Sequence, residues 1–318
     1  ISSFTFAEVS EHRIIVHAAD PVTRISPLMY GIFIEDINFA ADGGLYAELV
    51  KNRSFEFDEP FMGWDILRES PASGQVLLMK ETNRGHNPNF LQIRPAQNGA
   101  SLGLRNESFR GMGIEKGMTY HLSIDARSIS GYSDSIRAEI RTHQGDIIAS
   151  GSIKGFGAAW ETYHCEMMAS ATAENAQVTL WFEGSGEVDI DMISLFPTQT
   201  WKTRKNGLRA DLVQMLADME PGFLRFPGGC IVEGYDLSQR YQWKNTIGPI
   251  NERVVTINRW NFEFDHRSTP DYYQSFGLGF FEYFLLAEDL GAEPMPILNC
   301  GMACQFNTGE LAPLDELD

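Results

Sequence analysis

The chain has 318 residues, of which 43% are hydrophobic and 21% charged, a composition typical of a globular protein with room for two domains. Acidic residues outnumber basic ones by 43 to 25, which gives a formal net charge of −18. A surface of this sign repels nucleic-acid phosphates and anionic lipid, and no apolar run approaches the ~18 residues of a spanning helix, so we expect neither nucleic acid nor a membrane as partner.

The chain begins at Ile1 without an apolar leader, which suggests processing or trimming and leaves a lost signal peptide open. Its four cysteines, Cys165, Cys230, Cys300 and Cys304, are too few and too scattered to predict a disulfide framework. No second cysteine pair or nearby histidine completes a zinc site, so we expect no metal. The compartment stays unknown, with a secreted or periplasmic location weakly favoured.

The N-terminal region predicts one strand–helix unit. Leu28–Ile34 reads as a strand, Gly43-Gly44 as a loop, and Leu45–Val50 as a short helix.

From about Gly63 to Phe196 the pattern changes to short strands with turn residues between them and no convincing helix. Alternation of polar and apolar residues, as in Tyr120–Ala126, indicates strands with one buried and one solvated face, which predicts an antiparallel sandwich or jelly roll. The predicted strands are Gln75–Met79, Phe90–Ile93, Tyr120–Ala126, Ser135–Arg141, Ala176–Phe182 and Val188–Leu195.

After Pro197 the chain again predicts helices and strands in alternation. Apolar residues at helical spacing run from Leu208 to Met219, and a buried strand follows over Phe223–Phe226. A second helix is expected from about Gly277 to Leu290, and a strand over Met295–Asn299. Such alternation implies parallel pairing with right-handed crossovers, so the β-rich block is expected to be inserted between the first two βα units of an α/β domain.

Polar residues lie at the carboxyl ends of three of these strands, each just before a glycine-marked loop: Glu35, Arg225 and Asn299. Because the carboxyl ends of parallel strands converge in barrel folds, we expect the three to be neighbours. Each has an alternative: Glu35 as a capping or loop carboxylate, Arg225 in an ion pair at the core rim, Asn299 as a turn residue. Taken alone, Cys230 is more often a small buried hydrophobe and Trp260 a core or rim aromatic.

Other chemistries lack their motifs. The sequence has no G-x-S-x-G elbow, no H-E-x-x-H and no phosphate or dinucleotide loop, and its histidines are dispersed.

Several ordered segments resemble glycoside hydrolase family 51 α-L-arabinofuranosidases, and the resemblance covers nearly the whole chain. Within 63–196 the chain also resembles the carbohydrate-binding-like module of one subgroup, most clearly over Val178–Gly184 and Leu195–Pro197. The segments that carry the family resemblance are Ile25–Pro27, Gly31–Asn38, Asp42–Val50, Asn52–Phe57, Leu224–Cys230, Gly234-Tyr235, Ile247–Pro249 and Gly291–Pro294.

The resemblance implies the fold class: α/β plus β, the first part of a (β/α)8 TIM-type barrel interrupted by an inserted antiparallel β-sandwich, jelly-roll-like module. The implied domains are residues 1–60 with the first βα unit, 61–197 as the inserted module, and 198–318 with the second and third βα units, before barrel closure.

It also implies a retaining, exo-acting enzyme that needs no cofactor and removes terminal α-L-arabinofuranosyl groups from arabinoxylan, arabinan and related oligosaccharides. Arabinose-containing saccharides are then the expected partners, and a homo-oligomer is compatible with the resemblance. Retention needs two carboxyl groups about 5–5.5 Å apart. The family supplies them as glutamates after barrel strands four and seven, so neither is expected before Asp318. In the family the first of these glutamates follows an asparagine, as an Asn-Glu pair. Asn251-Glu252 has this pair, but it lies in the loop after Ile247–Pro249, so we interpret it as a chance match.

By the same resemblance, Glu35 bonds arabinose hydroxyls and Cys230 lines that subsite. Arg225 keeps the missing nucleophile ionised, since an adjacent cation favours the carboxylate. Trp260 is expected as an aromatic wall and Asn299 as a further contact. A non-catalytic carbohydrate-binding protein is the alternative, either with Trp64, Trp160 and Trp181 as a sugar platform or as a relative that has lost its glutamates.

Overall fold

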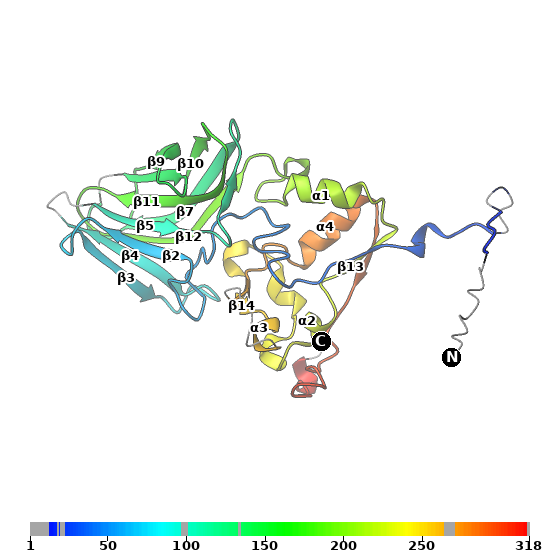
Figure 1. The fold of residues 1–318 in the computed structure, drawn as a ribbon. Coiled ribbons are helices and arrows are strands. Elements are labelled where there is room, and N and C mark those ends of the chain that lie inside the picture. The colour runs from blue at the N-terminus through cyan, green and yellow to red at the C-terminus, as the bar shows by residue number, and fades with distance from the viewer. Residues whose placement is uncertain are drawn as a thin grey trace, which may run out of the picture.

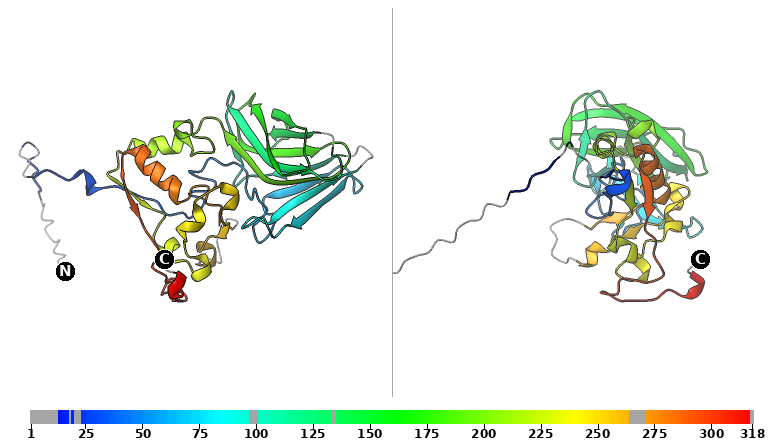
Figure 2. Two further views of the ribbon diagram at one scale, coloured as in Figure 1. Left: turned by 180° about the vertical axis from the view of Figure 1, so that it is seen from behind. Right: turned by 90° about the vertical axis from the view of Figure 1, so that its right-hand side faces the viewer.

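The computed structural model describes residues 13–17, 19, 23–96, 101–132, 135–263 and 271–316. Figure 1 shows two parts side by side, a β-sandwich and a part with helices and a small parallel sheet, and Figure 2 shows the same arrangement from behind. Among the described residues, no helix is long and apolar enough to cross a membrane.

The sandwich is built from two antiparallel sheets. One has the strand order β10-β7-β12-β4-β3, and the other has the order β2-β5-β11-β8-β9 with β6 also paired to β11. The strands are β2 (Trp64–Arg68), β3 (Gly74–Lys80), β4 (Asn89–Pro95), β5 (Leu102–Asn106), β6 (Met112–Ile114), β7 (Thr119–Ser128), β8 (Ile136–Arg141), β9 (Ile147–Ile153), β10 (Glu161–Met168), β11 (Ala173–Phe182) and β12 (Val188–Pro197).

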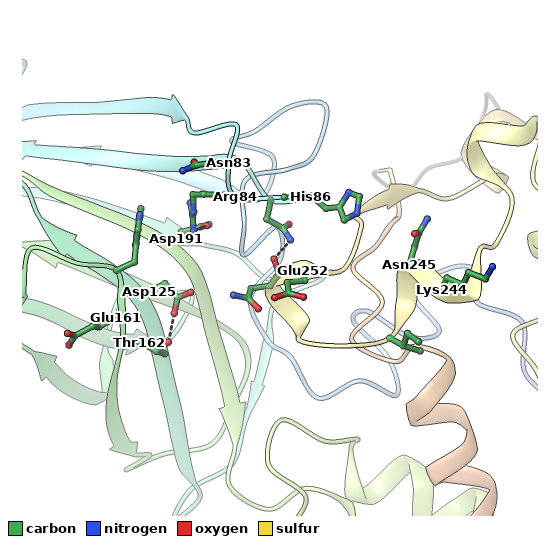
Figure 3. A pocket seen from close by; sticks show the side chains of 15 residues that line it. Asn83, Arg84, His86, Asp125, Glu161, Thr162, Asp191, Lys244, Asn245 and Glu252 are labelled. Carbon is green, nitrogen blue, oxygen red and sulfur yellow. Dashed lines mark hydrogen bonds and ion pairs between the residues drawn. The ribbon is translucent and has the colours of Figure 1, made fainter. Parts of the chain in front are cut away.

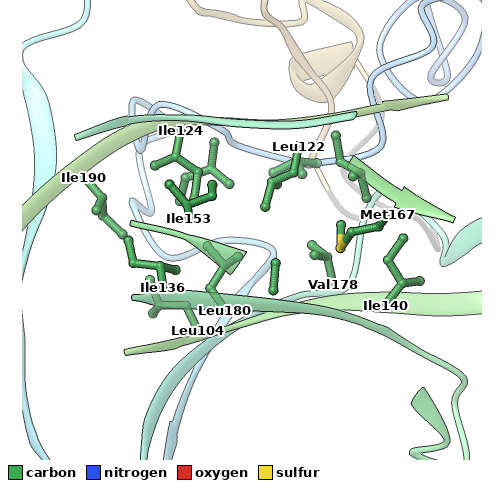
Figure 4. Packing of buried hydrophobic residues seen from close by; sticks show 14 of the residues in the cluster. Leu104, Leu122, Ile124, Ile136, Ile140, Ile153, Met167, Val178, Leu180 and Ile190 are labelled. Atoms are coloured by element: carbon green, nitrogen blue, oxygen red, sulfur yellow. The ribbon is translucent and has the colours of Figure 1, made fainter. Parts of the chain in front are cut away.

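The sandwich core forms where the inward residues of the two sheets meet. Leu122 and Ile124 of β7 are fully buried and face Leu104 and Leu180 of the opposite sheet (Figure 4). Along β7 the burial alternates residue by residue, as the period of two requires for a strand with one dry face. The sandwich therefore has its own hydrophobic core, and the predicted antiparallel sandwich is confirmed.

The second part contains three parallel strands in the order β1-β13-β16. Strand β1 is Ile32–Phe33, β13 is Phe223–Phe226 and β16 is Glu293–Pro296. The whole sandwich lies between β1 and β13 along the chain. The helices of this part are α1 (Ala210–Ala217), α2 (Cys230–Glu233), α3 (Trp260–Glu263) and α4 (Phe280–Leu290), and a two-stranded ribbon joins β14 (Thr256–Ile257) to β15 (Tyr273–Gln274).

Helix α4 packs on the parallel sheet through aromatic side chains. Phe226 of β13 is fully buried and stacks on Tyr283, with ring centroids 4.9 Å apart and an interplanar angle of 8°. Phe280 meets the same Phe226 ring edge-on at 5.4 Å. The helix ends at Gly291, which has φ of 67°, a left-handed conformation that glycine adopts without steric cost.

Each of the six predicted sandwich strands overlaps an observed strand, and the strand at Phe223–Phe226 is found with the same bounds. The helices expected at 208–219 and 277–290 are present but shorter, as α1 and α4. The first strand shrinks from the expected Leu28–Ile34 to Ile32–Phe33. The third parallel strand, β16, begins at Glu293 instead of Met295. Its two prolines are tolerated because β16, within the described residues, pairs with β13 alone and is therefore an edge strand.

The helix predicted over Leu45–Val50 is wrong. Instead of bonding within a helix, the Leu49 N–H donates to the Leu195 carbonyl at 3.0 Å. The buried Glu48 carboxylate accepts the N–H groups of Val50 and Leu195 at 3.0 and 2.9 Å and also pairs with Arg53 at 3.3 Å. These tertiary contacts with the end of β12 outweigh helix propensity in so short a segment.

Candidate active-site mouth

The carboxyl ends of the three parallel strands lie at one edge of the sheet. Phe33 is the register partner of Arg225, and Arg225 is the partner of Met295. The pairing continues beyond the strands, since the Asp36 N–H donates to the Pro227 carbonyl at 3.0 Å and the Ile297 N–H donates to the Phe226 carbonyl at 2.8 Å. We call the surface formed by Glu35, Arg225, Cys230 and the segments around them the mouth.

Glu35 is partly buried and one of its oxygens is committed to the backbone. Its Oε1 accepts the N–H groups of Gly229 and Ile231 at 3.3 and 3.1 Å, at the start of α2. Gly228 makes this approach possible, because a Cβ there would lie 2.5 Å from the Glu35 Cγ. Within the described residues, the second oxygen, Oε2, has no hydrogen-bond partner, so it remains an acceptor for a ligand hydroxyl.

Arg225 contributes a half-buried cation at the end of β13. Its guanidinium carbon lies 4.3 Å from the centroid of the Phe33 ring, a cation–π arrangement that holds the side chain against β1. Across the described ranges, no carboxylate forms an ion pair with Arg225, so the core-rim pair considered from sequence is not found. The structure thus places a carboxylate acceptor and a guanidinium donor on neighbouring strands.

Cys230 of the mouth and Trp260 beside it lie on separate segments, α2 and α3. The Cys230 side chain is exposed, and partial desolvation, with the charge of Glu35 adding to it, raises the pKa of its thiol, which favours the neutral form over a thiolate nucleophile. Arg259 joins the two segments. It donates to the Cys230 carbonyl at 3.0 Å while its guanidinium carbon lies 4.8 Å from the Trp260 ring.

Asn299 closes a turn after β16. Its amide donates to the carbonyls of Val232 and Met302 at 2.9 and 3.0 Å, and its oxygen accepts the Gly301 N–H at 2.7 Å. These bonds are those of the turn residue that the sequence offered as the alternative, and they tie the loop after β16 to α2.

A buried polar network behind Glu35 was not predicted from the sequence. Burial raises the pKa of Asp36 to about 6, although hydrogen bonds from the Tyr272 hydroxyl, from Gln274 at 2.8 Å and from the Ala41 N–H favour its ionised form. Asn258 donates to the Asp36 carbonyl at 2.7 Å. The network fixes the backbone that carries Glu35.

The tryptophan platform considered from sequence is not formed. Trp64 is buried in β2 and donates to the Asn52 carbonyl at 2.9 Å, and Trp181 donates to Glu139 at 2.8 Å. Trp160 precedes β10 in the other sheet. Among the residues that the structure describes, no three His, Cys, Asp or Glu side chains gather as metal ligands.

Comparisons with known proteins point to one family. The family profile described as the alpha-L-arabinofuranosidase 1 domain matches residues 215–318. An extracellular exo-α-L-arabinofuranosidase of Streptomyces chartreusis is 34% identical over 310 residues, covering 92% of this chain and 35% of that protein. Alpha-L-arabinofuranosidase 1 of Arabidopsis thaliana is 33% identical, covering 88% of this chain and 41% of that protein.

The same class emerges from a solved structure. An arabinose-bound GH51 α-L-arabinofuranosidase aligns with a TM-score of 0.79 and 29% identity, covering 93% of this chain and 47% of that one. The fold and sequence together define an α/β chain, with a sandwich between its first two parallel strands, that is similar to glycosidases. Over about nine-tenths of its length, the chain is homologous to the family GH51 α-L-arabinofuranosidases. It spans less than half the length of these relatives.

Proposed function

We propose that the protein carrying this chain is a retaining, exo-acting α-L-arabinofuranosidase that releases terminal α-L-arabinofuranosyl groups from arabinoxylan- or arabinan-type polysaccharides and oligosaccharides. The observation that carries the proposal is the placement of Glu35 and Arg225 at the same carboxyl edge of a parallel sheet, in a chain homologous to such enzymes. Active sites of (β/α)8 barrels are built at that edge.

The three parallel strands are proposed to be part of such a barrel. Residues 1–60 and 198–318 would contribute to it, and residues 61–197 would form the inserted module. The sandwich and the α/β part each have their own hydrophobic cluster, which supports two domains, with Val50 and Phe55 packing into the sandwich cluster and Phe196 into the other.

The roles proposed for the mouth residues follow from their free groups. The Oε2 of Glu35 accepts a hydrogen bond from an arabinose hydroxyl, and the Arg225 guanidinium stabilises an anionic carboxylate beside it. Cys230 and Trp260 line the sugar subsite. Asn299 shapes the loop after β16 and supports the subsite through its bond to α2.

The two carboxyl groups of the retaining mechanism are assigned to the part of the family that this chain does not span, which is more than half of the relatives' length. In this mechanism one carboxylate attacks the sugar carbon while the other, as an acid, protonates the leaving oxygen. The acid then acts as base when water releases the sugar. Glu35 is assigned to sugar binding through its free oxygen and takes neither role in this proposal.

The test replaces Glu35 by Gln in the protein carrying this chain. Glu35→Gln keeps the shape but removes the charge that strengthens the bond to the sugar, so kcat/KM for an aryl α-L-arabinofuranoside is expected to fall about 10- to 100-fold. Nuclear magnetic resonance of the released sugar should show a retained α-configuration.

The matched control is Glu174→Gln, which changes an exposed carboxylate on β11 and should leave kcat/KM unchanged. No release of arabinose by the unmodified protein, or an inverted product, would overturn the proposed function. An unchanged kcat/KM in Glu35→Gln would overturn the role given to Glu35.

A further inference from the structure

A cleft lies at the junction of the sandwich and the α/β part, away from the strand ends that form the mouth. Its volume is about 770 Å³, within the ~300–1,000 Å³ typical of ligand sites. One wall comes from the sandwich and the loop between β3 and β4, and the other from residues 244–252 (Figure 3).

The cleft is lined mainly by polar side chains with unused hydrogen-bonding groups. Asn83 lies on the sandwich wall, and Asn245 and Glu252 lie on the opposite wall. Considering only the described part of the chain, the side chains of these three residues hydrogen-bond to no other residue. Amide groups can donate and accept at once, and a carboxylate can accept, which matches the hydroxyls of a sugar.

The two walls are joined by hydrogen bonds and do not need to assemble around a ligand. Asn87, in the β3–β4 loop, donates to the carbonyls of Asn251 and Arg253 at 2.7 and 3.1 Å. Arg253 in turn pairs with Glu282 of α4 at 2.8 Å. The opposing walls are therefore held in register before binding, which lowers the entropy lost on association.

The floor of the cleft is also fixed. Arg84 pairs with the fully buried Asp191 at 2.7 Å, and its guanidinium carbon lies 4.3 Å from the Trp160 ring. Arg127 lies against the same ring at 4.7 Å. With two guanidinium groups on it, the Trp160 ring packs within the protein, so recognition in the cleft rests on hydrogen bonds more than on stacking.

The charges of the lining select the ligand. The acidic side chains of the lining besides Asp191, which pairs with Arg84, are Asp125, Glu161 and Glu252, and they outnumber the cations Arg84 and Lys244. This lining repels an anionic ligand and leaves a neutral one without penalty.

We propose that this cleft binds a neutral oligosaccharide segment, the main chain of the polysaccharide whose arabinose branches are removed at the mouth. The site is distinct from the mouth residues, and the inference rests on the proposed function only for the identity of the sugar chain.

The experiment measures binding by isothermal titration calorimetry with the protein carrying this chain. The probes are the neutral oligomers xylohexaose and arabinohexaose, with a hexamer of galacturonic acid as the anionic counterpart. The double variant Asn245→Ala/Glu252→Ala is expected to bind the preferred neutral oligomer about tenfold more weakly, because two hydrogen-bonding groups are lost. A preference for xylohexaose would identify xylan as the main chain, and a preference for arabinohexaose would identify arabinan.

The matched control is Gln144→Ala/Glu174→Ala, which removes an exposed amide from the β8–β9 loop and an exposed carboxylate from β11. It should bind like the unmodified protein. Asn83→Ala, on the opposite wall, should weaken binding on its own.

Hydrolysis of an aryl α-L-arabinofuranoside separates this inference from the proposed function. The cleft variants should keep kcat/KM for this small substrate, which reports only on the mouth. Unchanged affinity for both neutral oligomers in the cleft variants, or equal binding of the anionic hexamer, would overturn the cleft assignment while leaving the proposed function intact. Weakened binding in a protein that releases no arabinose would support the cleft and remove the proposed function.

Discussion

At the scale of single residues, Glu35 at the mouth combines a structural bond with a free group. Glu35 gives one oxygen to the start of α2 and keeps the other for a ligand. A capping role and a sugar-binding role, which the sequence offered as alternatives, are thus compatible in one carboxylate. The fixed oxygen reduces the rotational freedom that binding would otherwise have to remove.

Asp191 shows how burial at this scale creates pH dependence. Burial raises its pKa from 3.8 to about 8, although Arg84 favours the charged form. Because the folded chain holds this proton more tightly than the unfolded chain, Asp191 contributes stability that is full below about pH 4 and is lost as the pH rises through about 8.

The prediction concerns Asp191→Asn, which cannot ionise. Relative to that of the unmodified chain, the free energy of unfolding of the variant should increase progressively as the pH rises from about 5 to 8.5, because only the unmodified chain loses stability over this range. Urea unfolding of both proteins at several pH values measures this difference. A difference independent of pH, or one that falls as the pH rises, would contradict the assignment.

At the level of elements, β13 and α4 depend on one aromatic cluster. Phe226 is fully buried between Phe280 and Tyr283, so Phe226→Ala leaves a cavity under the strand that carries Arg225. We expect a loss of about 3–5 kcal/mol in the free energy of unfolding, measured by chemical denaturation.

Phe306→Ala is the matched control, since this phenylalanine is 90% exposed. It should change stability by less than about 0.5 kcal/mol. Equal losses in the two variants would show that the aromatic cluster does not stabilise the sheet.

Elements with a strong local pattern were predictable from the sequence, and those fixed by distant contacts were not. The alternation in Tyr120–Ala126 identified β7 because each inward residue is buried in the same sandwich core. The segment 45–50 carried apolar residues compatible with a helix, but its conformation is set by Leu195, far along the chain.

The same limit applies to the mouth. Glu35 and Arg225 were singled out because each lies at the end of a recognisable strand, a local signal. Tyr272 and Gln274 hydrogen-bond to Asp36 from more than 230 positions away in the sequence. No spacing or motif in the sequence predicts these contacts. An acidic residue next to Glu35 in the strand-end segment was the one available hint.

For the molecule as a whole, we predict that the purified 318-residue chain does not hydrolyse an aryl α-L-arabinofuranoside. Retention needs two cooperating carboxyl groups about 5–5.5 Å apart. At the mouth, Glu35 is tied to α2 and Asp36 is buried in its own network. A chromogenic assay, with the Streptomyces chartreusis enzyme as the positive control, measures this. Turnover by the chain alone would require that the catalytic carboxyl groups lie within it.

The placement of the sandwich between β1 and β13 has a consequence for biosynthesis. Phe33 and Arg225 are partners in the sheet, yet the ribosome makes the entire sandwich between them. At ~5–20 residues per second, β1 waits on the order of ten seconds or more for its partner. The sandwich can complete its own core in that interval, while β1 leaves the exit tunnel as an unpaired strand. The nascent chain should therefore be most dependent on chaperones after its first strand has emerged and before its thirteenth is made.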